Sequence, residues 1–304
     1  MSISNYPNGF KNGITIRGVP ITVTNPGETF WVNNSGVLAK GGIGGSDGND
    51  GSYQKPFATI DYAVGRCTAG RGDTIMVMPG HAETVSAAGD IVLDVEGISV
   101  IGLGSGTNRP TITFDTAATA DIDINAENIT VANIIFSANF ADIAAAIDVN
   151  ASAFTMQNCH FKATAILKNF KICIQPAAVN WMELVENTAL LLDAADTHWV
   201  NLSAGGDGHI ISGNLLHGNW GTAAIGGAGA VTRCTITDNR IFNIATDADS
   251  CINMAATATG IMSGNHSAGG HATAGHVPGD LGSIENYYVL STSDLSGVLD
   301  PAIV

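Results

Sequence analysis

Two stretches of the sequence repeat one pattern: Ile129-Thr-Val-Ala-Asn133-Ile-Ile-Phe136 and Phe154-Thr-Met-Gln-Asn158-Cys-His-Phe161. In each stretch an apolar residue stands four positions before an Asn, and another stands three positions after it. The pattern returns more weakly along the chain and defines a series of six Asn residues. They are Asn133, Asn158, Asn187, Asn214, Asn239 and Asn265, separated by 25, 29, 27, 25 and 26 residues.

A near-constant period of this length, filled with short alternating strands such as residues 98–101 and 74–78, is typical of a parallel β-helix. A leucine-rich repeat would require regularly placed leucines, which the chain lacks. Asn tolerates the left-handed backbone conformation, and its amide can bond to an Asn one coil away. We therefore predict an all-β chain folded as a right-handed parallel β-helix, in which the six Asn residues form a structural ladder.

The composition and net charge of the chain argue against some classes of binding partner. The chain is 45% apolar and 13% charged, and its net charge is −15 with 12 Lys and Arg. This charge repels nucleic acid and anionic membranes, so we expect neither as a partner, and no motif indicates a cofactor. No signal peptide or long apolar run is evident, which predicts assembly in a cytoplasm. The five cysteines lack paired spacing and are expected to be free thiols.

The period covers only part of the chain and so divides it into three segments. Residues 1–40 carry turn signals outside the repeat and are predicted to form an N-terminal attachment arm. Residues 41–280 are predicted to form the β-helix, and residues 281–304 a C-terminal strand and tail. Residues 61–67 place Ala63, Val64 and Cys67 on one helical face with Ile60, which predicts a short helix capping the N-terminal end of the stack.

The residues that open the β-helix resemble a known superfamily. Gly45-Ser-Asp-Gly-Asn-Asp-Gly-Ser-Tyr-Gln-Lys-Pro-Phe-Ala-Thr-Ile60, followed by Gly72-Asp-Thr-Ile-Met-Val-Met-Pro-Gly-His-Ala-Glu83, is similar to the first coil of pectate-lyase-like β-helix repeat proteins. The resemblance covers residues 45 to 280 and implies the fold. It leaves the function open, because polysaccharide lyases, tailspikes and non-enzymatic virion proteins share this opening.

The N-terminal arm, Asn5-Tyr-Pro-Asn-Gly-Phe-Lys-Asn-Gly-Ile-Thr-Ile-Arg-Gly-Val-Pro20, resembles the leader of structural proteins of tailed bacteriophages. That resemblance implies a homotrimer on the virion surface, assembled in the host cytoplasm, that decorates or cements the capsid or sits on the tail. Its partners would be further copies of itself and the major capsid protein or another virion protein. The residues expected to attach the arm are Tyr6, Phe10, Ile14, Ile16 and Arg17.

Catalysis on this fold requires carboxylates gathered on one face. Lyases need acidic calcium ligands near a basic residue, and hydrolases need two or three carboxylates close together. The pairs Asp121/Asp123 and Asp247/Asp249 have the spacing that places both side chains on one face of a strand. One period after the first pair comes Asp148 alone, and residues 218–222, one period before the second pair, contain no carboxylate. We interpret both pairs as solvated turn residues, assign no catalytic residue, and expect the chain not to be an enzyme.

Two further residue sets are weaker candidates for a site. His266, His271 and His276 recur every five residues in a Gly-rich segment and are weak candidates for a metal site, with a surface loop as the preferred interpretation. Trp181, Trp199 and Trp220 are spaced too closely for equivalent coil positions, which argues against a common sugar-stacking face. The preferred hypothesis is thus a phage virion structural protein. The alternatives are a polysaccharide depolymerase, either lyase or hydrolase, that acts on a host surface glycan and a non-catalytic glycan-binding adhesin.

Overall fold

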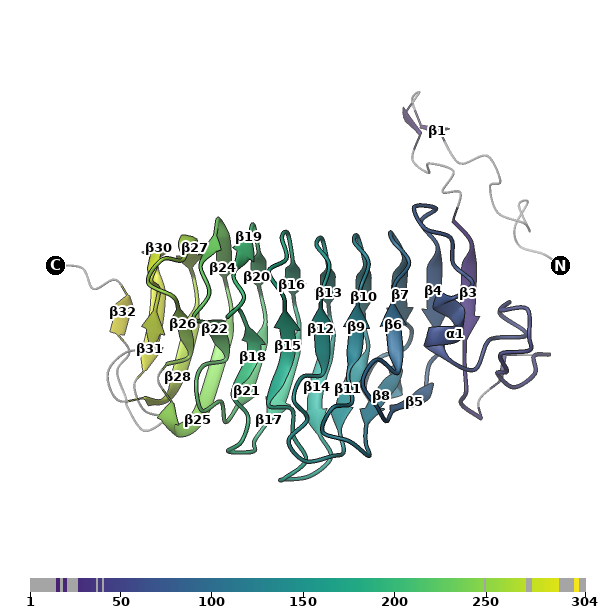
Figure 1. Cartoon of the computed structure of the whole chain (residues 1–304), viewed down its shortest axis with the longest axis horizontal. Coiled ribbons are helices and arrows are strands. Elements are labelled where there is room, and N and C mark those ends of the chain that lie inside the picture. The colour runs from purple at the N-terminus through teal and green to yellow at the C-terminus, as the bar shows by residue number, and fades with distance from the viewer. Residues whose placement is uncertain are drawn as a thin grey trace.

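The computed structural model describes residues 15–16, 19–20, 27–36, 38–39, 41–248, 250–271, 275–289 and 298–300. For residues 15–16, 19–20, 246–248, 270–271 and 298–300 it describes the backbone alone. The chain forms a right-handed parallel β-helix of stacked coils, seen side-on in Figure 1. The predicted fold class is confirmed.

The coils between the two ends of the stack each contribute one strand to each of three sheets, whose strands pair in parallel from coil to coil. The first sheet contains β3 (Thr29–Val32), β4 (Thr74–Val77), β7 (Ser99–Gly102), β10 (Thr130–Ala132), β13 (Thr155–Gln157), β16 (Glu183–Val185), β20 (Ile210–Ser212), β24 (Cys234–Thr237), β27 (Thr259–Ser263) and β30 (Asp280–Ile284). The second contains β5 (Ala82–Val85), β8 (Thr111–Phe114), β11 (Ile135–Ala138), β14 (His160–Ala163), β17 (Thr188–Leu191), β21 (Leu215–Gly218), β25 (Arg240–Ala248), β28 (His266–His271), β31 (Asn286–Val289) and, antiparallel at its end, β32 (Val298–Asp300). The third contains β6 (Ile91–Leu93), β9 (Ile122–Ile124), β12 (Ile147–Val149), β15 (Ile172–Pro176), β18 (His198–Asn201), β22 (Ile225–Gly227), β26 (Ile252–Met254) and β29 (His276–Val277).

The remaining elements are small. They are the antiparallel pair β1 (Thr15–Ile16) and β2 (Val19–Pro20), the parallel pair β19 (Gly206–Asp207) and β23 (Val231–Thr232), the helix α1 (Ile60–Val64) and the 3-10 turn η1 (Gly106–Asn108). The helix α1 begins after Thr59, whose hydroxyl accepts a hydrogen bond from the Tyr62 N–H. It packs against β3, β4 and β6 at the N-terminal end of the stack and is shorter than predicted, because the chain leaves the helix at Gly65.

The stack extends beyond residues 41–280 at both ends. β3 lies within the segment predicted to be the arm, yet it pairs in parallel with β4 as the first strand of the first sheet. At the other end β31 continues the second sheet past residue 280. The β-helix therefore includes residues that the repeat pattern assigned to the arm and to the tail.

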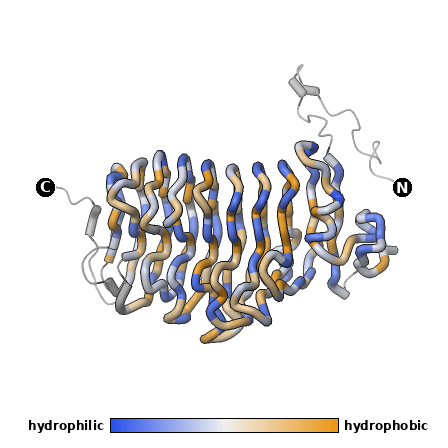
Figure 2. The backbone as a smooth tube through the Cα atoms, viewed as in Figure 1, coloured by the Kyte–Doolittle hydropathy of each residue, from blue (hydrophilic) through white to orange (hydrophobic). Residues whose placement is uncertain are grey.

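Alternation along each strand fills the interior. In β8, β9 and β12 every second side chain is buried, and Figure 2 shows hydrophobic and hydrophilic residues interspersed along the coils. Four phenylalanines from successive coils meet inside, with Phe136 and Phe161 stacked at 5.0 Å and Phe114 and Phe170 edge-on at 5.1 Å between ring centroids. The interior is continuous because no coil can cover its own inner face.

The six predicted ladder residues do not lie in a single column. Asn133 and Asn158 adopt the left-handed conformation, with φ of 58° and 53°, and the Asn158 amide donates to Asn133 Oδ1 at 3.0 Å. The strand register aligns Gln157 with Val185, which places Asn158 opposite Glu186 and not opposite Asn187. It is Glu186 that has the left-handed φ of 55° in that coil. The predicted interval from Asn158 to Asn187 thus contains a one-residue shift.

The later Asn residues form a buried column of their own. Asn187, Asn214, Asn239 and Asn265 each donate from Nδ2 to the Oδ1 of the next, at 2.8 to 3.1 Å, and the column ends at Asn286, which the sequence analysis missed. Each Nδ2 also donates to a backbone carbonyl of the preceding coil, as from Asn239 to Ile211 at 2.9 Å. Each Oδ1 from Asn214 onward also accepts the backbone N–H of the preceding Asn in the column. All five residues are at most 1% exposed, so the column satisfies its polar groups internally.

Candidate active site

Three carboxylates gather on the outer face of the third sheet, near the N-terminal end of the stack. Asp123 is the outward residue of β9, between the buried Ile122 and Ile124, and Asp148 is the outward residue of β12. The parallel register pairs Asp123 directly with Asp148, which sets their backbones about 4.8 Å apart. Asp121 immediately precedes β9. We call Asp121, Asp123 and Asp148 the carboxylate cluster.

Burial and neighbouring negative charges raise the pKa of two carboxyl groups in this cluster. Burial, followed by the charges of Asp121 and Asp123, raises the pKa of Asp148 to about 6. Burial also raises the pKa of Asp121, a hydrogen bond from the Gly89 N–H opposes this, and the charge of Asp123 adds to it. The Oδ1 atom of Asp148 is buried and has no hydrogen-bond partner among the described residues. Asp148 therefore binds its proton at a higher pH than an ordinary aspartate does.

A glycine of the preceding coil supports the cluster. The Gly89 N–H donates to Asp121 Oδ1 at 2.5 Å, and the backbone of Gly89 is left-handed, with a φ of 62°. A Cβ atom at this position would lie 3.2 Å from Asp123 Oδ2. Glycine thus lets the turn approach both aspartates while donating a hydrogen bond to one of them.

Beyond the cluster, polar side chains continue along the same face. The register extends the row from Asp148 to Gln175 and then to Asn201, and the Asn201 amide donates to Gln175 Oε1 at 2.9 Å. Further along, the surface is hollowed to about 280 Å³ beside His198, Thr222 and Asn253. Burial lowers the pKa of His198 to about 4, so this imidazole is neutral at physiological pH. The third sheet therefore presents a polar strip that crosses several coils.

The prediction that Asp121 and Asp123 are solvated turn residues is corrected by the structure, which places Asp123 within β9. The single acid Asp148 follows Asp123 by one full coil, and this spacing in the sequence is the signal for the cluster. A pair on one strand and a single acid on the next are enough for a three-carboxylate cluster. Of the second pair, Asp247 is described only as backbone within β25, and Asp249 lies outside the described residues.

The three histidines are not brought together in the described part of the chain. His266 is exposed on the outer face of β28, whereas His276 is buried in β29 of another sheet, with Nε2 2.8 Å from Ser267 Oγ. His271 is described only as backbone in β28. Among the described residues no group of three His, Cys, Asp or Glu is arranged to hold a metal ion.

The tryptophans, the cysteines and the arm residues complete the predicted set. Trp199 and Trp220 are fully buried, while Trp181 is 54% exposed and lies beneath the Arg233 guanidinium, so the three do not share a sugar-binding face. All five cysteines are free. Tyr6, Phe10, Ile14 and Arg17 lie outside the described residues, and Ile16 is described only as backbone in β1. No helix in the described residues is both long and apolar enough to cross a membrane.

Fold and site together define a right-handed parallel β-helix protein that carries a carboxylate cluster on its third sheet. The chain belongs to the family described as "Protein of unknown function (DUF1565)", whose profile matches residues 43–286. No curated protein matches the chain.

Two solved structures resemble the fold at low identity. A rhamnogalacturonan lyase is 13% identical with a TM-score of 0.46, over 86% of this chain and 66% of its own. A lacto-N-biosidase of glycoside hydrolase family 136 from Eubacterium ramulus is 11% identical with a TM-score of 0.49, over 79% of this chain and 56% of its own. The chain thus spans less than two thirds of the length of either structure, and the likeness concerns the fold alone.

The prediction that the chain is not an enzyme is corrected. The finding against it is that the solved structures similar to this chain include a rhamnogalacturonan lyase and a lacto-N-biosidase. The carboxylates, which were expected not to gather, are also brought together, because the strand register pairs Asp123 with Asp148.

Proposed function

We propose that this protein cleaves the glycosidic bonds of a glycan at the carboxylate cluster. The observation that carries the proposal is the pairing of Asp123 with Asp148 on adjacent strands, where burial and neighbouring charges raise the pKa of Asp148 to about 6. Glycoside hydrolysis requires one carboxyl group to donate a proton and another to act as an anion, and the raised pKa of Asp148 suits it to the first of these tasks. The polar strip through Gln175 and Asn201 would bind further sugar units of the same chain.

In this proposal Asp148 is the general acid. Its proton passes to the glycosidic oxygen as the bond from that oxygen to the anomeric carbon breaks. The ionised carboxylate of Asp123 attacks the anomeric carbon, and water, deprotonated by Asp148, later releases the sugar from Asp123. Asp121, held by the Gly89 N–H, contributes the negative charge that keeps the proton on Asp148.

The strand spacing favours retention of the anomeric configuration. Carboxyl groups about 5 Å apart act by double displacement, whereas inversion requires a wider gap that admits water. Adjacent parallel strands set Asp123 and Asp148 near the shorter spacing. A lyase is less well supported, because the charges that act on Asp148 are those of Asp121 and Asp123, with no Lys or Arg among them.

The test is a screen of purified polysaccharides with the full chain, measuring new reducing ends and the ultraviolet absorbance of unsaturated uronates. We expect reducing ends without that absorbance, and a loss of at least about 100-fold in rate for Asp148→Asn and Asp123→Asn. The matched control is Asp94→Asn, which removes the same charge from an exposed residue just after β6 on the same sheet. Full activity in Asp148→Asn would refute the assignment, and unsaturated products would show elimination instead.

Virion attachment, a homotrimer and a location on the virion surface stay predictions. They rest on the resemblance of residues 5–20, which lie almost entirely outside the described residues. An adhesin that binds a glycan without cleaving it would appear in the same screen as binding with no new reducing ends.

A further inference from the structure

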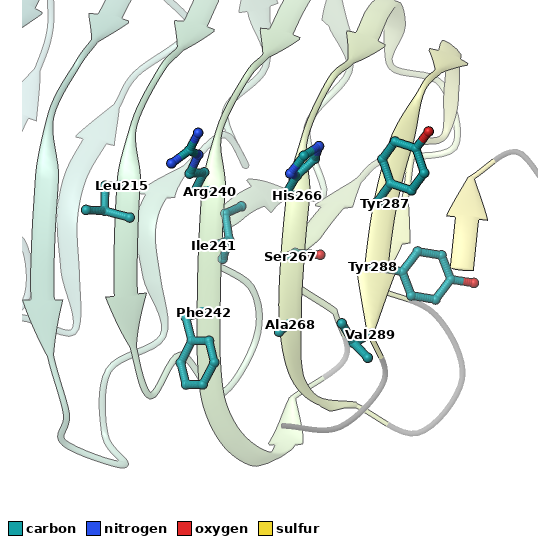
Figure 3. A pocket seen from close by; sticks show the side chains of 10 residues that line it. All are labelled: Leu215, Arg240, Ile241, Phe242, His266, Ser267, Ala268, Tyr287, Tyr288 and Val289. Atoms are coloured by element: carbon teal, nitrogen blue, oxygen red, sulfur yellow. The ribbon is translucent and has the colours of Figure 1, made fainter. Parts of the chain in front are cut away.

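A second hollow lies on a different sheet, at the opposite end of the stack from the carboxylate cluster. It occupies the outer face of β25, β28 and β31 in the second sheet and has a volume of about 450 Å³ (Figure 3). Two rows of side chains form it. The register aligns Arg240, His266 and Tyr287 in one row, and Phe242, Ala268 and Val289 in the other. We call these six residues the C-terminal hollow.

A small residue between larger ones creates the depression. Ala268 lies between Phe242 and Val289 on adjacent strands, and its methyl group leaves the space that a larger side chain would fill. Phe242 is 39% exposed and Tyr287 is 46% exposed, so both rings are accessible at the surface. Exposed aromatic rings around a concavity are typical of ligand sites.

The rings are held in position by neighbouring imidazoles. His217 meets Phe242 edge-on at 4.9 Å between centroids, and His266 meets Tyr287 edge-on at 5.4 Å. Each contact joins equivalent positions on adjacent coils, so the strands themselves fix the spacing. A ligand that stacks on these rings would meet a surface that is already ordered, which lowers the entropic cost of binding.

The charge of the hollow differs from that of the chain as a whole. The chain carries a net charge of −15, yet the exposed Arg240 stands at the rim and forms no ion pair among the described residues. Asp238 and Glu285 line an adjoining hollow together with Arg240, and none of their carboxylate oxygens lies within 4.0 Å of its guanidinium nitrogens. A planar guanidinium binds a carboxylate through two parallel hydrogen bonds.

From this arrangement we propose that the C-terminal hollow binds an acidic sugar unit, with its carboxylate on Arg240 and its ring against Phe242 and Tyr287. The aromatic rings match the apolar C–H face of a sugar, and the arginine selects the acidic sugar over a neutral one. The site lies on another sheet from the carboxylate cluster and does not depend on catalysis there. It would hold a glycan to the protein without taking part in bond cleavage.

The experiment is a binding assay with the full chain carrying Asp148→Asn, which prevents cleavage and separates this proposal from the proposed function. An array of immobilised oligosaccharides containing galacturonate, glucuronate or sialic acid is compared with the same oligosaccharides after carboxyl reduction. We expect binding to at least one acidic oligosaccharide, and binding at least about tenfold weaker to its reduced form. No acidic oligosaccharide bound, or equal binding of acidic and reduced forms, would overturn the proposal.

Two variants then locate the site. Arg240→Gln removes the charge, and Ala268→Leu fills the hollow while keeping the charge; each is expected to weaken binding of the acidic oligosaccharide at least tenfold. The control is Arg66→Gln, which removes an exposed arginine that also lies over an aromatic ring, Tyr62, at the far end of the stack. Circular dichroism verifies that each variant is folded. Unchanged affinity in both Arg240→Gln and Ala268→Leu would place the acidic sugar elsewhere and refute the assignment.

Discussion

The buried Asn column and the carboxylate cluster are built by the same stacking of coils, with opposite results. In the column, Asn187, Asn214, Asn239, Asn265 and Asn286 repeat an amide, which has both a donor and an acceptor, so each residue satisfies the next. In the cluster, Asp123 and Asp148 repeat a group that only accepts hydrogen bonds when ionised. Neighbouring Asn side chains in the column therefore attract one another, whereas neighbouring carboxylates in the cluster repel one another.

Whether the buried polar groups are paired distinguishes the Asn column, which is structural, from the carboxylate cluster, which is proposed to be functional. A buried polar network stabilises a fold when every member is paired, and it costs stability when members are left unpaired. The column meets that condition, whereas Asp148 Oδ1 is buried with no partner among the described residues. Asp196, between the second and third sheets, is a further case, because neither of its buried carboxylate oxygens has such a partner. Unpaired carboxylates are therefore where this β-helix stores unfavourable electrostatic energy.

Breaking the column should have the largest effect on stability. Asn239→Ala leaves the buried Asn214 N–H without its partner and removes the side-chain hydrogen bond to the Ile211 carbonyl, and we expect it to lower the free energy of unfolding by about 3 kcal/mol in urea denaturation. The comparison is Asn158→Gly, which removes an exposed ladder bond at a left-handed position that glycine tolerates, and which should cost less than about 1 kcal/mol. Equal losses would mean that the two Asn groups are equivalent after all.

Asp196 should give the next largest effect, with a dependence on pH. Burial raises its pKa to about 8, above the value of about 3.9 in the unfolded chain, so the folded state binds the extra proton. Stability from this group is complete below pH 4 and is lost as the pH rises through 8. Asp196→Asn should therefore stabilise the protein by about 2 kcal/mol more at pH 9 than at pH 5, since water entry reduces the cost of the buried charge. The same difference in the free energy of unfolding between the unchanged protein and Asp196→Asn at both pH values would contradict this prediction.

Asp148 should show the same sign over a lower pH range. Its raised pKa of about 6 means that its contribution to stability is present below pH 4 and lost as the pH rises through 6. Because Asp148 is partly exposed, we expect Asp148→Asn to stabilise the protein by only about 1 kcal/mol at pH 8, and not at pH 4, in thermal unfolding at the two pH values. If the Asp148→Asn variant is more stable but has lost the proposed activity, Asp148 serves function at the expense of stability. Destabilisation at pH 8 would argue that Asp148 is structural.

The smallest expected effect is a change in the pKa of Asp148 when its neighbour Asp123 is replaced. Asp123→Asn removes one of the two charges that raise the pKa of Asp148, so that pKa should fall. It should stay above the ordinary value, because burial, the larger cause, is unchanged. Titration of the Asp148 carboxyl carbon, followed by nuclear magnetic resonance, measures the pKa of Asp148 in the unchanged protein and in the Asp123→Asn variant. An unchanged pKa would show that the two carboxylates do not interact.

The sequence predicts those parts of the fold that depend on a repeat or on the periodicity of neighbouring residues. The alternating strands and the short helix near Ile60 follow from residues close together in the chain, and the Asn series follows from a regular period along it; together they predict a right-handed parallel β-helix. The opening residues 45–60 and 72–83 indicate the superfamily fold, although the first strand of the stack, β3, lies before them. The arm was predicted from turn signals outside the repeat, and the homotrimer and the virion partners from the resemblance of a short leader; all three stay predictions.

The carboxylate cluster and the C-terminal hollow depend on strand register, which sequence spacing alone leaves uncertain. Successive coils differ in length, because Val131 pairs with Val100 on one side and with Met156 on the other, and the first of these intervals is the longer. The difference lies in the loops, while backbone hydrogen bonds within the sheets decide which residues face each other. A count that is wrong by one residue turns a side chain from the outer face to the interior, as the shift between Asn158 and Asn187 illustrates. The sequence by itself therefore determined that the chain would stack into coils, and only the tertiary structure decided which aspartates, rings and arginine would meet across them.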